Sequence, residues 1–392
     1  MTSQGMNLTP MEMLTRLVSF DTESEKSNLE LIAFVEAYLA SWGIASVRVP
    51  NAEGDKAALF ASVGPADKGG ILLSGHTDVV PVEGQAWSSN PFALRVADGR
   101  AYGRGAVDMK AFDALALTLM PKMLHQNPAL PLHILLSYDE ETSCLGSVEA
   151  IGLLGRDLPM PVMAIVGEPT ELQVADAHKS CAIFSTVVHG YPAHSAKPYL
   201  GANAVMAGAE IVTELNRISD EMIARGDESG RFDPPYTTVQ VGIMNGGTAR
   251  NILPEQCVIQ WEYRGLPGLD NAEIPARLEK ASAAIQENRL NRFGPFGRIE
   301  TTCPAFVPGL RPDRGSPAEK LALALTGNDS TITVSYATEA GHFQEAGIPT
   351  VVCGPGSINQ AHQADEYITL EQFAAGEDFM QRLQGFCQNG TL

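Results

Sequence analysis

Short apolar runs that end in glycine or in a carboxylate residue alternate along the chain with stretches whose apolar residues recur at helical spacing. Leu29, Ile32 and Leu39 have this helical spacing and predict a helix over residues 28–42. The short runs predict strands at residues 45–49, 57–63, 71–74, 132–138, 162–166 and 350–353. This alternation predicts an α/β domain with a mostly parallel sheet flanked by helices.

The middle of the chain has a different order of elements. It predicts strands at 181–188, 237–243, 257–263 and 299–303, with helices at 202–218 and 272–288. The order β-α-β-β-α-β is typical of a two-layer α+β domain of the ferredoxin-like kind. We therefore expect one domain made of residues 1–180 and 306–392, and a second domain, residues 181–305, inserted into it.

Composition and charge narrow the possible functions. The chain has 392 residues, which is too long for one ordinary core, and Lys and Arg total 27 against 46 Asp and Glu. The formal charge of -19 repels nucleic acid and anionic lipid, and the six cysteines form no CxxC pair that would suggest a thiolate metal site. With no signal-like start and no apolar stretch long enough for a bilayer, we expect a cytoplasmic protein that binds neither nucleic acid nor membrane.

Acidic and imidazole side chains follow several of the predicted strands. They are His76, Asp78, Glu140, Glu141, Glu168 and His362. Any one of them could cap a helix or form an ordinary hydrogen bond, but the carboxyl ends of parallel strands meet at one edge of a sheet, where ligands bind. A buried cluster of unpaired carboxylates would cost several kcal/mol, which bound divalent cations would offset.

Imidazole and carboxylate ligands without thiolate suit zinc, cobalt or manganese. Two such ions about 3.5 to 4 Å apart, bridged by a carboxylate, form a hydrolytic arrangement. Asp108, within GRGAVDMKAF, is a candidate for the bridge.

Five motifs, in this order, resemble the metal-site motifs of the dinuclear zinc aminoacylase and acetylornithine deacetylase family. They are SGHTDVVP at 74–81, YGRGAVDMK at 102–110, YDEET at 138–142, GEPT at 167–170 and AHQADE at 361–366. The resemblance covers nearly the whole chain. It implies two divalent ions, zinc first, with cobalt or manganese as alternatives.

The resemblance also implies a role for each site residue. Asp108 would bridge the ions, with His76 and Glu168 on one ion and Glu141 and His362 on the other. Glu140 would be the general base, and Asp78 would accept a hydrogen bond from the far nitrogen of His76. The peptide bond between Asp108 and Met109 would be cis, as it is in the family.

The inserted domain resembles the family's lid and dimerisation domain. GYPAHSAKP at 190–198 matches the motif whose histidine reaches into a neighbouring subunit's active site, so His194 is the candidate donor to the oxyanion of a homodimer. GGTARNILPE at 246–255 matches a loop near the bound substrate, which makes Arg250 and Asn251 candidates for binding its carboxylate.

Residues 338–362 look closest to the acetylornithine deacetylase branch, in which Glu339 would pair with a cationic group of the substrate. His342 departs from that branch, where an apolar residue is more common. The resemblance implies an enzyme that removes acetate from N-acetyl-L-ornithine in arginine biosynthesis. A succinyl-diaminopimelate desuccinylase, a broader hydrolase of N-acyl amino acids and a non-catalytic metal-binding scaffold are the alternatives.

Overall fold

The computed structural model describes residues 5–390, without the side chains at positions 294 and 295. The chain forms two compact units. Unit 1 contains the chain up to Ala177, the segment Leu310–Thr333, and the chain from Thr338 onward. Unit 2 contains His178–Gly309 and Val334–Ala337.

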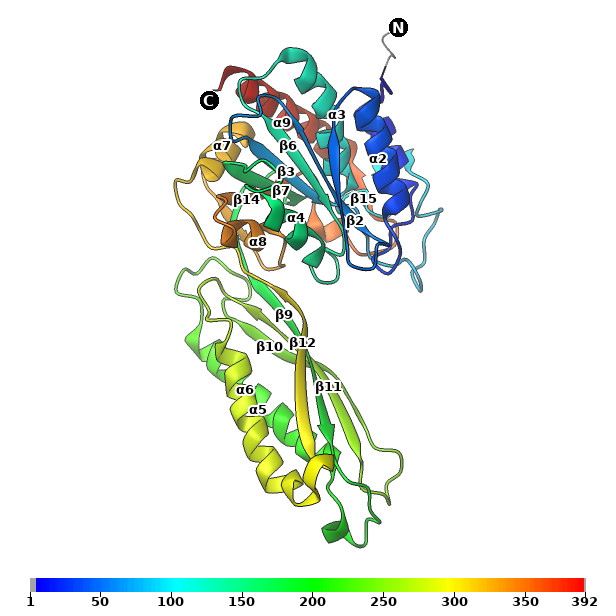
Figure 1. Ribbon diagram of the computed structural model, residues 1–392, viewed down its shortest axis with the longest axis vertical. Coiled ribbons are helices and arrows are strands. Elements are labelled where there is room, and N and C mark those ends of the chain that lie inside the picture. The colour runs from blue at the N-terminus through cyan, green and yellow to red at the C-terminus, as the bar shows by residue number, and fades with distance from the viewer. Residues whose placement is uncertain (1–4, 391–392) are drawn as a thin grey trace. The chain divides into compact units, whose positions relative to one another are not determined.

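Unit 1 is built on an eight-stranded sheet with helices on both faces (Figure 1). In sheet order its strands are β1 (Ser46–Pro50), β2 (Ala57–Val63), β6 (Leu132–Ser137), β3 (Ile71–His76), β7 (Met163–Pro169), β14 (Thr350–Gly354), β8 (Ala175–His178) and β13 (Ile332–Val334). The four neighbours β6, β3, β7 and β14 are parallel, whereas β2 is antiparallel to β1 and β6. The predicted α/β fold is therefore confirmed, and the carboxyl ends of the four parallel strands share one edge.

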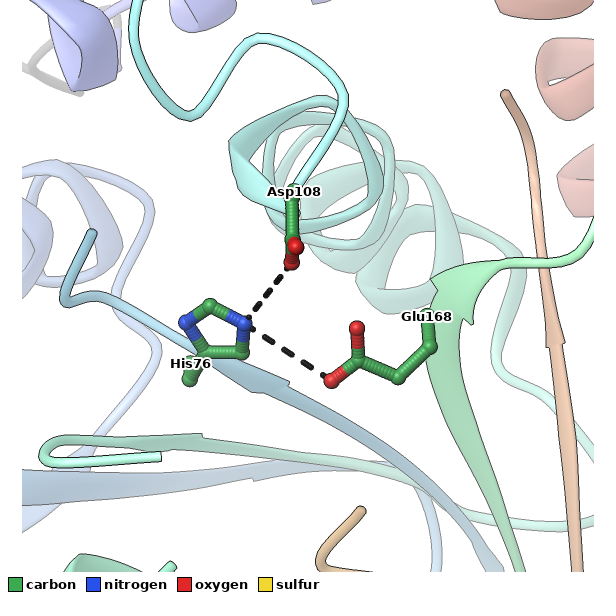
Figure 2. A group of neighbouring side chains, drawn as sticks. All are labelled: His76, Asp108 and Glu168. Carbon is green, nitrogen blue, oxygen red and sulfur yellow. Dashed lines mark hydrogen bonds and ion pairs between the residues drawn. The ribbon is translucent and has the colours of Figure 1, made fainter. Parts of the chain in front are cut away.

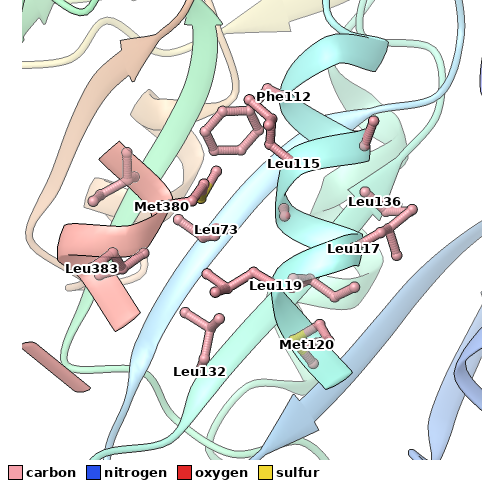
Figure 3. Close-up of a cluster of buried hydrophobic side chains, with 14 of the residues drawn as sticks. Leu73, Phe112, Leu115, Leu117, Leu119, Met120, Leu132, Leu136, Met380 and Leu383 are labelled. Carbon is pink, nitrogen blue, oxygen red and sulfur yellow. The ribbon is translucent and has the colours of Figure 1, made fainter. Parts of the chain in front are cut away.

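The main core of unit 1 combines side chains of this sheet with side chains of α1 (Pro10–Val18), α2 (Leu29–Ser41), α3 (Lys110–Gln126), α7 (Pro317–Thr326) and α9 (Leu370–Asn389). The unit also contains α4 (Val148–Leu153) and α8 (Ala340–Glu345). Figure 3 shows Leu115 and Leu119 of α3 beside Leu73 of β3, with Met380 and Leu383 of α9 nearby. This packing fixes the start of α3 against the sheet.

Shorter elements complete the fold. A three-stranded sheet contains β15 (Tyr367–Thr369), β5 (Arg100–Tyr102) and β4 (Arg95–Ala97). Short helical turns lie at Leu145–Ser147, Pro198–Leu200, Gln286–Leu290, Asn291–Phe296 and Ile358–Gln360. None of the helices between residues 5 and 390 has the length and apolar character needed to cross a membrane.

Unit 2 has a four-stranded antiparallel sheet in the order β10, β11, β9, β12. Its elements along the chain are β9 (Ser180–His189), α5 (Ala204–Arg225), β10 (Thr238–Gly246), β11 (Gln256–Gly265), α6 (Glu273–Ile285) and β12 (Arg298–Val307). A separate core includes Ile211 of α5, Leu278 of α6 and the stacked rings of Phe184 and Trp261, whose centroids are 4.1 Å apart. The element order is the predicted β-α-β-β-α-β.

Helix α9 approaches α3 closely at one glycine. A Cβ atom on Gly376 would lie 2.6 Å from the side chain of Leu115 and 3.1 Å from the ring of Pro355. Around Gly385, in the same helix, no atom of residues 5–390 comes within 4 Å of such a position, apart from the adjacent residues and the helix backbone. Both glycines lie in α9, and they differ in how closely other side chains pack against them.

We expect Gly376→Ala to destabilise unit 1, because overpacking typically costs about 1–3 kcal/mol and exceeds the gain of about 0.5–1 kcal/mol from helix propensity. Gly385→Ala should be stabilising by about 0.5–1 kcal/mol, because only the helix-propensity gain applies. Urea unfolding of both variants measures the difference. Equal stability of the two variants would contradict the close approach.

Asp113 in the first turn of α3 is a buried carboxyl group that lies against β3. A Cβ atom on Gly75 would come within 2.0 Å of its Oδ1, so the glycine gives this carboxyl its space. No hydrogen-bond partner within residues 5–390 reaches Oδ1. Burial raises the pKa of Asp113 to about 8, although His76 and Lys110 act in the opposite direction.

The raised pKa of Asp113 predicts a loss of stability with rising pH. The unfolded carboxyl ionises near its ordinary pKa of about 4, whereas the folded one keeps its proton to about pH 8. Stability is therefore lost as pH rises through this window. Asp113→Asn should remove that loss, because its amide does not ionise. As pH rises from about 5 to about 8, the free energy of unfolding of the variant should increase relative to that of wild type by about 1–3 kcal/mol. Urea unfolding of chelator-treated wild type and Asp113→Asn at both pH values is the test. The same change in free energy of unfolding with pH in the two proteins would contradict the raised pKa of Asp113.

Candidate metal centre

Three buried side chains meet at the carboxyl edge of the parallel strands. His76 ends β3, Glu168 lies near the end of β7, and Asp108 comes just before α3. The Nε2 atom of His76 is 3.1 Å from Oδ1 of Asp108 and 3.7 Å from Oε1 of Glu168 (Figure 2). Among the described residues, Oε1 of Glu168 has no hydrogen-bond partner. These atoms can act together as ligands of one ion.

A second group of three shares Asp108. Nε2 of His362 lies 3.1 Å from Oδ2 of Asp108 and 2.9 Å from Oε2 of Glu141. Within each group the possible ligand atoms lie within 4.8 Å of one another. The five residues predicted as ligands thus form two sets of three, with one oxygen of Asp108 in each set. The Asp108–Met109 peptide bond is cis, so that expectation is confirmed.

Glu140 lies beside both groups and belongs to neither. Its Oε2 is 3.9 Å from Nε2 of His76, and its Oε1 is 3.3 Å from Sγ of Cys144. Burial raises the pKa of Glu140 well above the ordinary value, and the neighbouring carboxylates Glu141 and Asp108 add to this rise. The site therefore holds a buried carboxyl group that lies close to the ligands and is in neither ligand set.

The electrostatics of the site suit bound cations. Burial raises the pKa of Glu168 well above its ordinary value and that of Glu141 to about 7, and repulsion from neighbouring carboxylates acts in the same direction. Nearby divalent cations would favour the ionised forms and offset the cost of burying them. The nitrogen and oxygen donors fit zinc, cobalt or manganese.

Asp78 has a different contact from the one expected. The sequence predicted that its carboxylate accepts a hydrogen bond from His76, but Nδ1 of His76 lies 2.9 Å from the backbone carbonyl of Asp78 and 3.6 Å from Oδ1. The carboxylate instead accepts hydrogen bonds from the backbone N–H groups of Glu140, at 3.1 Å, and Glu141, at 3.3 Å. The prediction was wrong about the acceptor atom, because these two amides already engage the carboxylate.

Glu339 precedes α8 and is only 1% exposed. Its carboxylate accepts hydrogen bonds from the hydroxyl groups of Ser74 in β3, at 2.9 Å, and Ser137 in β6. Burial raises the pKa of Glu339 to about 7. A cationic group of a substrate would have to replace these hydroxyl donors, so the role of Glu339 in substrate recognition stays a prediction.

The remaining predicted residues lie in unit 2. The backbone N–H of Ser195, next to His194, donates to the carbonyl of Asn251 at 3.0 Å, so the two loops pair. His194, Arg250 and Asn251 are all exposed. Nδ1 of His194 accepts a hydrogen bond from the N–H of Ala196 at 3.0 Å, which leaves the proton of a neutral ring on Nε2. Arg250 also lines a groove of about 380 Å³.

Arg104 and Glu366, for which the sequence predicted no role, form a buried ion pair. Oε1 of Glu366 accepts the backbone N–H of Asp108 at 3.2 Å. Both residues lie inside motifs that carry the family resemblance, YGRGAVDMK and AHQADE. Their position in those motifs was the available signal, but the pairing itself depends on residues far apart in sequence.

Comparison with known proteins bears on the family of the chain. Residues 72–384 match the model of peptidase family M20/M25/M40. The chain is 34% identical over 370 residues to an acetylornithine deacetylase of Proteus mirabilis, covering 94% of this chain and 92% of that protein. It is 33% identical over 372 residues to an acetylornithine deacetylase of Pasteurella multocida, covering 94% of each.

Solved structures agree on the fold. An M20 family metallo-carboxypeptidase from Sulfolobus solfataricus aligns with a TM-score of 0.76 at 18% identity, covering 96% of this chain and 99% of that one. A tripeptidase from Staphylococcus aureus aligns with a TM-score of 0.73 at 18% identity, covering 97% and 98%. The family resemblance predicted from the motifs is confirmed. The chain belongs to peptidase family M20/M25/M40 and is a metal-dependent amide hydrolase.

Proposed function

We propose that the protein hydrolyses N-acetyl-L-ornithine to L-ornithine and acetate. The observation that carries the hydrolytic part is a buried carboxyl group, Glu140, that lies beside two ligand sets sharing Asp108 and belongs to neither set. The choice of substrate is supported by relatives at 33–34% identity that are named acetylornithine deacetylases. Arginine biosynthesis in the cytoplasm is the corresponding setting.

We assign two divalent ions to the site, zinc first and cobalt or manganese as alternatives. His76, Asp108 and Glu168 would hold one ion, and Asp108, Glu141 and His362 the other. When bound, such ions polarise the amide carbonyl and lower the pKa of water. The residues around them then have to place the substrate and move one proton.

Glu140 is the residue we assign to that proton. Its carboxylate accepts a proton from water as the water oxygen bonds to the acetyl carbon, and it returns the proton to the nitrogen as the carbon–nitrogen bond breaks. Burial raises the pKa of Glu140, which suits a group that must hold a proton between these steps. Asp78 holds the Glu140 backbone through the hydrogen bond at 3.1 Å.

We further propose that the protein is a homodimer in which His194 of one subunit serves the site of the other. The proton on Nε2 of His194 makes that atom a donor, as an oxyanion that forms on the amide requires. Arg250 and Asn251 would bind the substrate carboxylate, and Glu339 its cationic end. The exposure of His194, Arg250 and Asn251 is consistent with these roles.

The substrate proposal is tested by assaying metal-loaded protein with N-acetylornithine, N-acetylcitrulline, N-succinyl-diaminopimelate and a dipeptide. N-acetylcitrulline is the matched control, since it is similar in size and lacks the charged amine. We expect kcat/KM to be highest for N-acetylornithine, by about tenfold or more over N-acetylcitrulline, because N-acetylcitrulline has no charged amine to pair with a carboxylate of the enzyme. Preference for the succinyl substrate would favour the desuccinylase alternative, and no hydrolysis of any substrate would favour the scaffold.

The division of roles between the adjacent glutamates gives a second test. Glu140→Ala should lower kcat by a factor on the order of 10² to 10⁴ and still bind two ions, because only the proton carrier is lost. Glu141→Ala should lose one ion, because that ion would keep only His362 and Asp108 as ligands. Metal analysis after dialysis measures both variants. Equal metal loss in the two would show that the assignment of roles is mistaken.

A further inference from the structure

The buried ion pair of Arg104 and Glu366 connects to the backbone of the predicted bridging ligand. Nη1 of Arg104 is 2.6 Å from Oε2 of Glu366, and both side chains are 1% exposed. The other oxygen of Glu366 accepts the N–H groups of Val107, at 3.0 Å, and Asp108, at 3.2 Å. Because a buried ion pair by itself adds little to stability, its contacts are the informative feature.

The same arginine also connects to His362 through Gln85. Nη2 of Arg104 donates to Oε1 of Gln85 at 2.5 Å, and Nε2 of Gln85 donates to the backbone carbonyl of His362 at 3.1 Å. Trp87 supports this arrangement, since its Nε1 donates to Oε1 of Gln85 at 3.0 Å and its ring lies 5.1 Å from the Arg104 guanidinium. The amide of Gln85 thus uses its oxygen for Arg104 and Trp87 and its nitrogen for His362.

His362 needs such support more than the other ligands do. Its side chain is 51% exposed, so packing restrains it little, whereas the side chain of His76 is 1% exposed. Its φ angle of 62° lies in the left-handed region, which costs a residue other than glycine about 1–3 kcal/mol. Asp365, in the same loop, has a φ of 56° and accepts hydrogen bonds from the N–H and hydroxyl of Ser88. Residues 85–88 therefore hold this loop at two places.

We propose that Gln85, Arg104 and Glu366 are positioning residues that set the placement of His362 and Asp108, and so determine the affinity for the ions that these two ligands would hold. The proposal rests on the two-ion site of the proposed function. None of the three residues is in either ligand set, so each acts through the residues it contacts. Residues that orient ligands in this way commonly change metal affinity by about 10–100-fold when they are replaced.

The two branches of this network lead to different expectations. The Gln85 branch reaches only His362, which belongs to one ligand set. The Glu366 branch reaches the backbone of Asp108, which belongs to both. Loss of the first branch should weaken one ion selectively, whereas loss of the second should weaken both.

Gln85→Met keeps the length of the side chain and removes its amide, which is the donor to His362 and the acceptor for Arg104 and Trp87. Gln384→Met makes the same exchange in α9. Titration calorimetry of the metal-free proteins with Zn²⁺ or Co²⁺ measures the two affinities. We expect Gln85→Met to raise the Kd of one ion by about 10–100-fold and to leave the other within about threefold. Gln384→Met should match wild type, and urea unfolding of the metal-free proteins should show that Gln85→Met folds normally.

Glu366→Gln tests the branch that reaches Asp108 and should raise the Kd values of both ions. Cooperative urea unfolding of its metal-free form is the control that the variant folds. Wild-type affinity for both ions in Gln85→Met, or equal weakening of both, would overturn the proposal. If wild type binds fewer than two ions, the two-ion site fails and this proposal fails with it. If wild type binds two ions but hydrolyses no acetylated amino acid, only the substrate assignment fails, and the result for Gln85→Met still stands.

Discussion

Buried carboxylates crowd one edge of the parallel sheet in unit 1, and they repel one another. Glu140, Glu141 and Glu168 are brought to one edge of the parallel sheet, and burial raises the pKa of each. A carboxylate in such a place either takes up a proton or has a cation nearby. An imidazole nitrogen of His76 lies beside one oxygen of Asp108 and one of His362 beside the other, an arrangement that suits bound cations.

The protein holds these charged groups in place largely through backbone amides. Asp78 accepts the N–H groups of Glu140 and Glu141, and Glu366 accepts the N–H of Asp108. Two carboxylates outside the ligand sets therefore fix the main chain beside residues that are in them. Since a small displacement of a ligand has a large effect on a metal site, this backbone support links the fold to the chemistry.

Features that depend on local pattern or on residue type could be predicted from the sequence alone. Apolar periodicity is local, so it predicted the alternation of strands and helices in unit 1 and the β-α-β-β-α-β order of unit 2. Position at strand ends, together with the motif resemblance, indicated the five residues that the structure brings together as two sets. Parallel strands place their carboxyl ends at one edge, so this convergence followed from the predicted fold.

The pairing of polar groups that are far apart in sequence depends on the tertiary fold. Arg104 and Glu366 are separated by 262 positions, and Ser74 and Glu339 by 265. The acceptor for His76 also proved to be the carbonyl of Asp78 rather than its carboxylate. Several polar residues compete for each such contact, and the outcome depends on strand order and on the packing of α3 and α9 against the sheet. A local pattern contains neither of these, because both arise from the core as a whole.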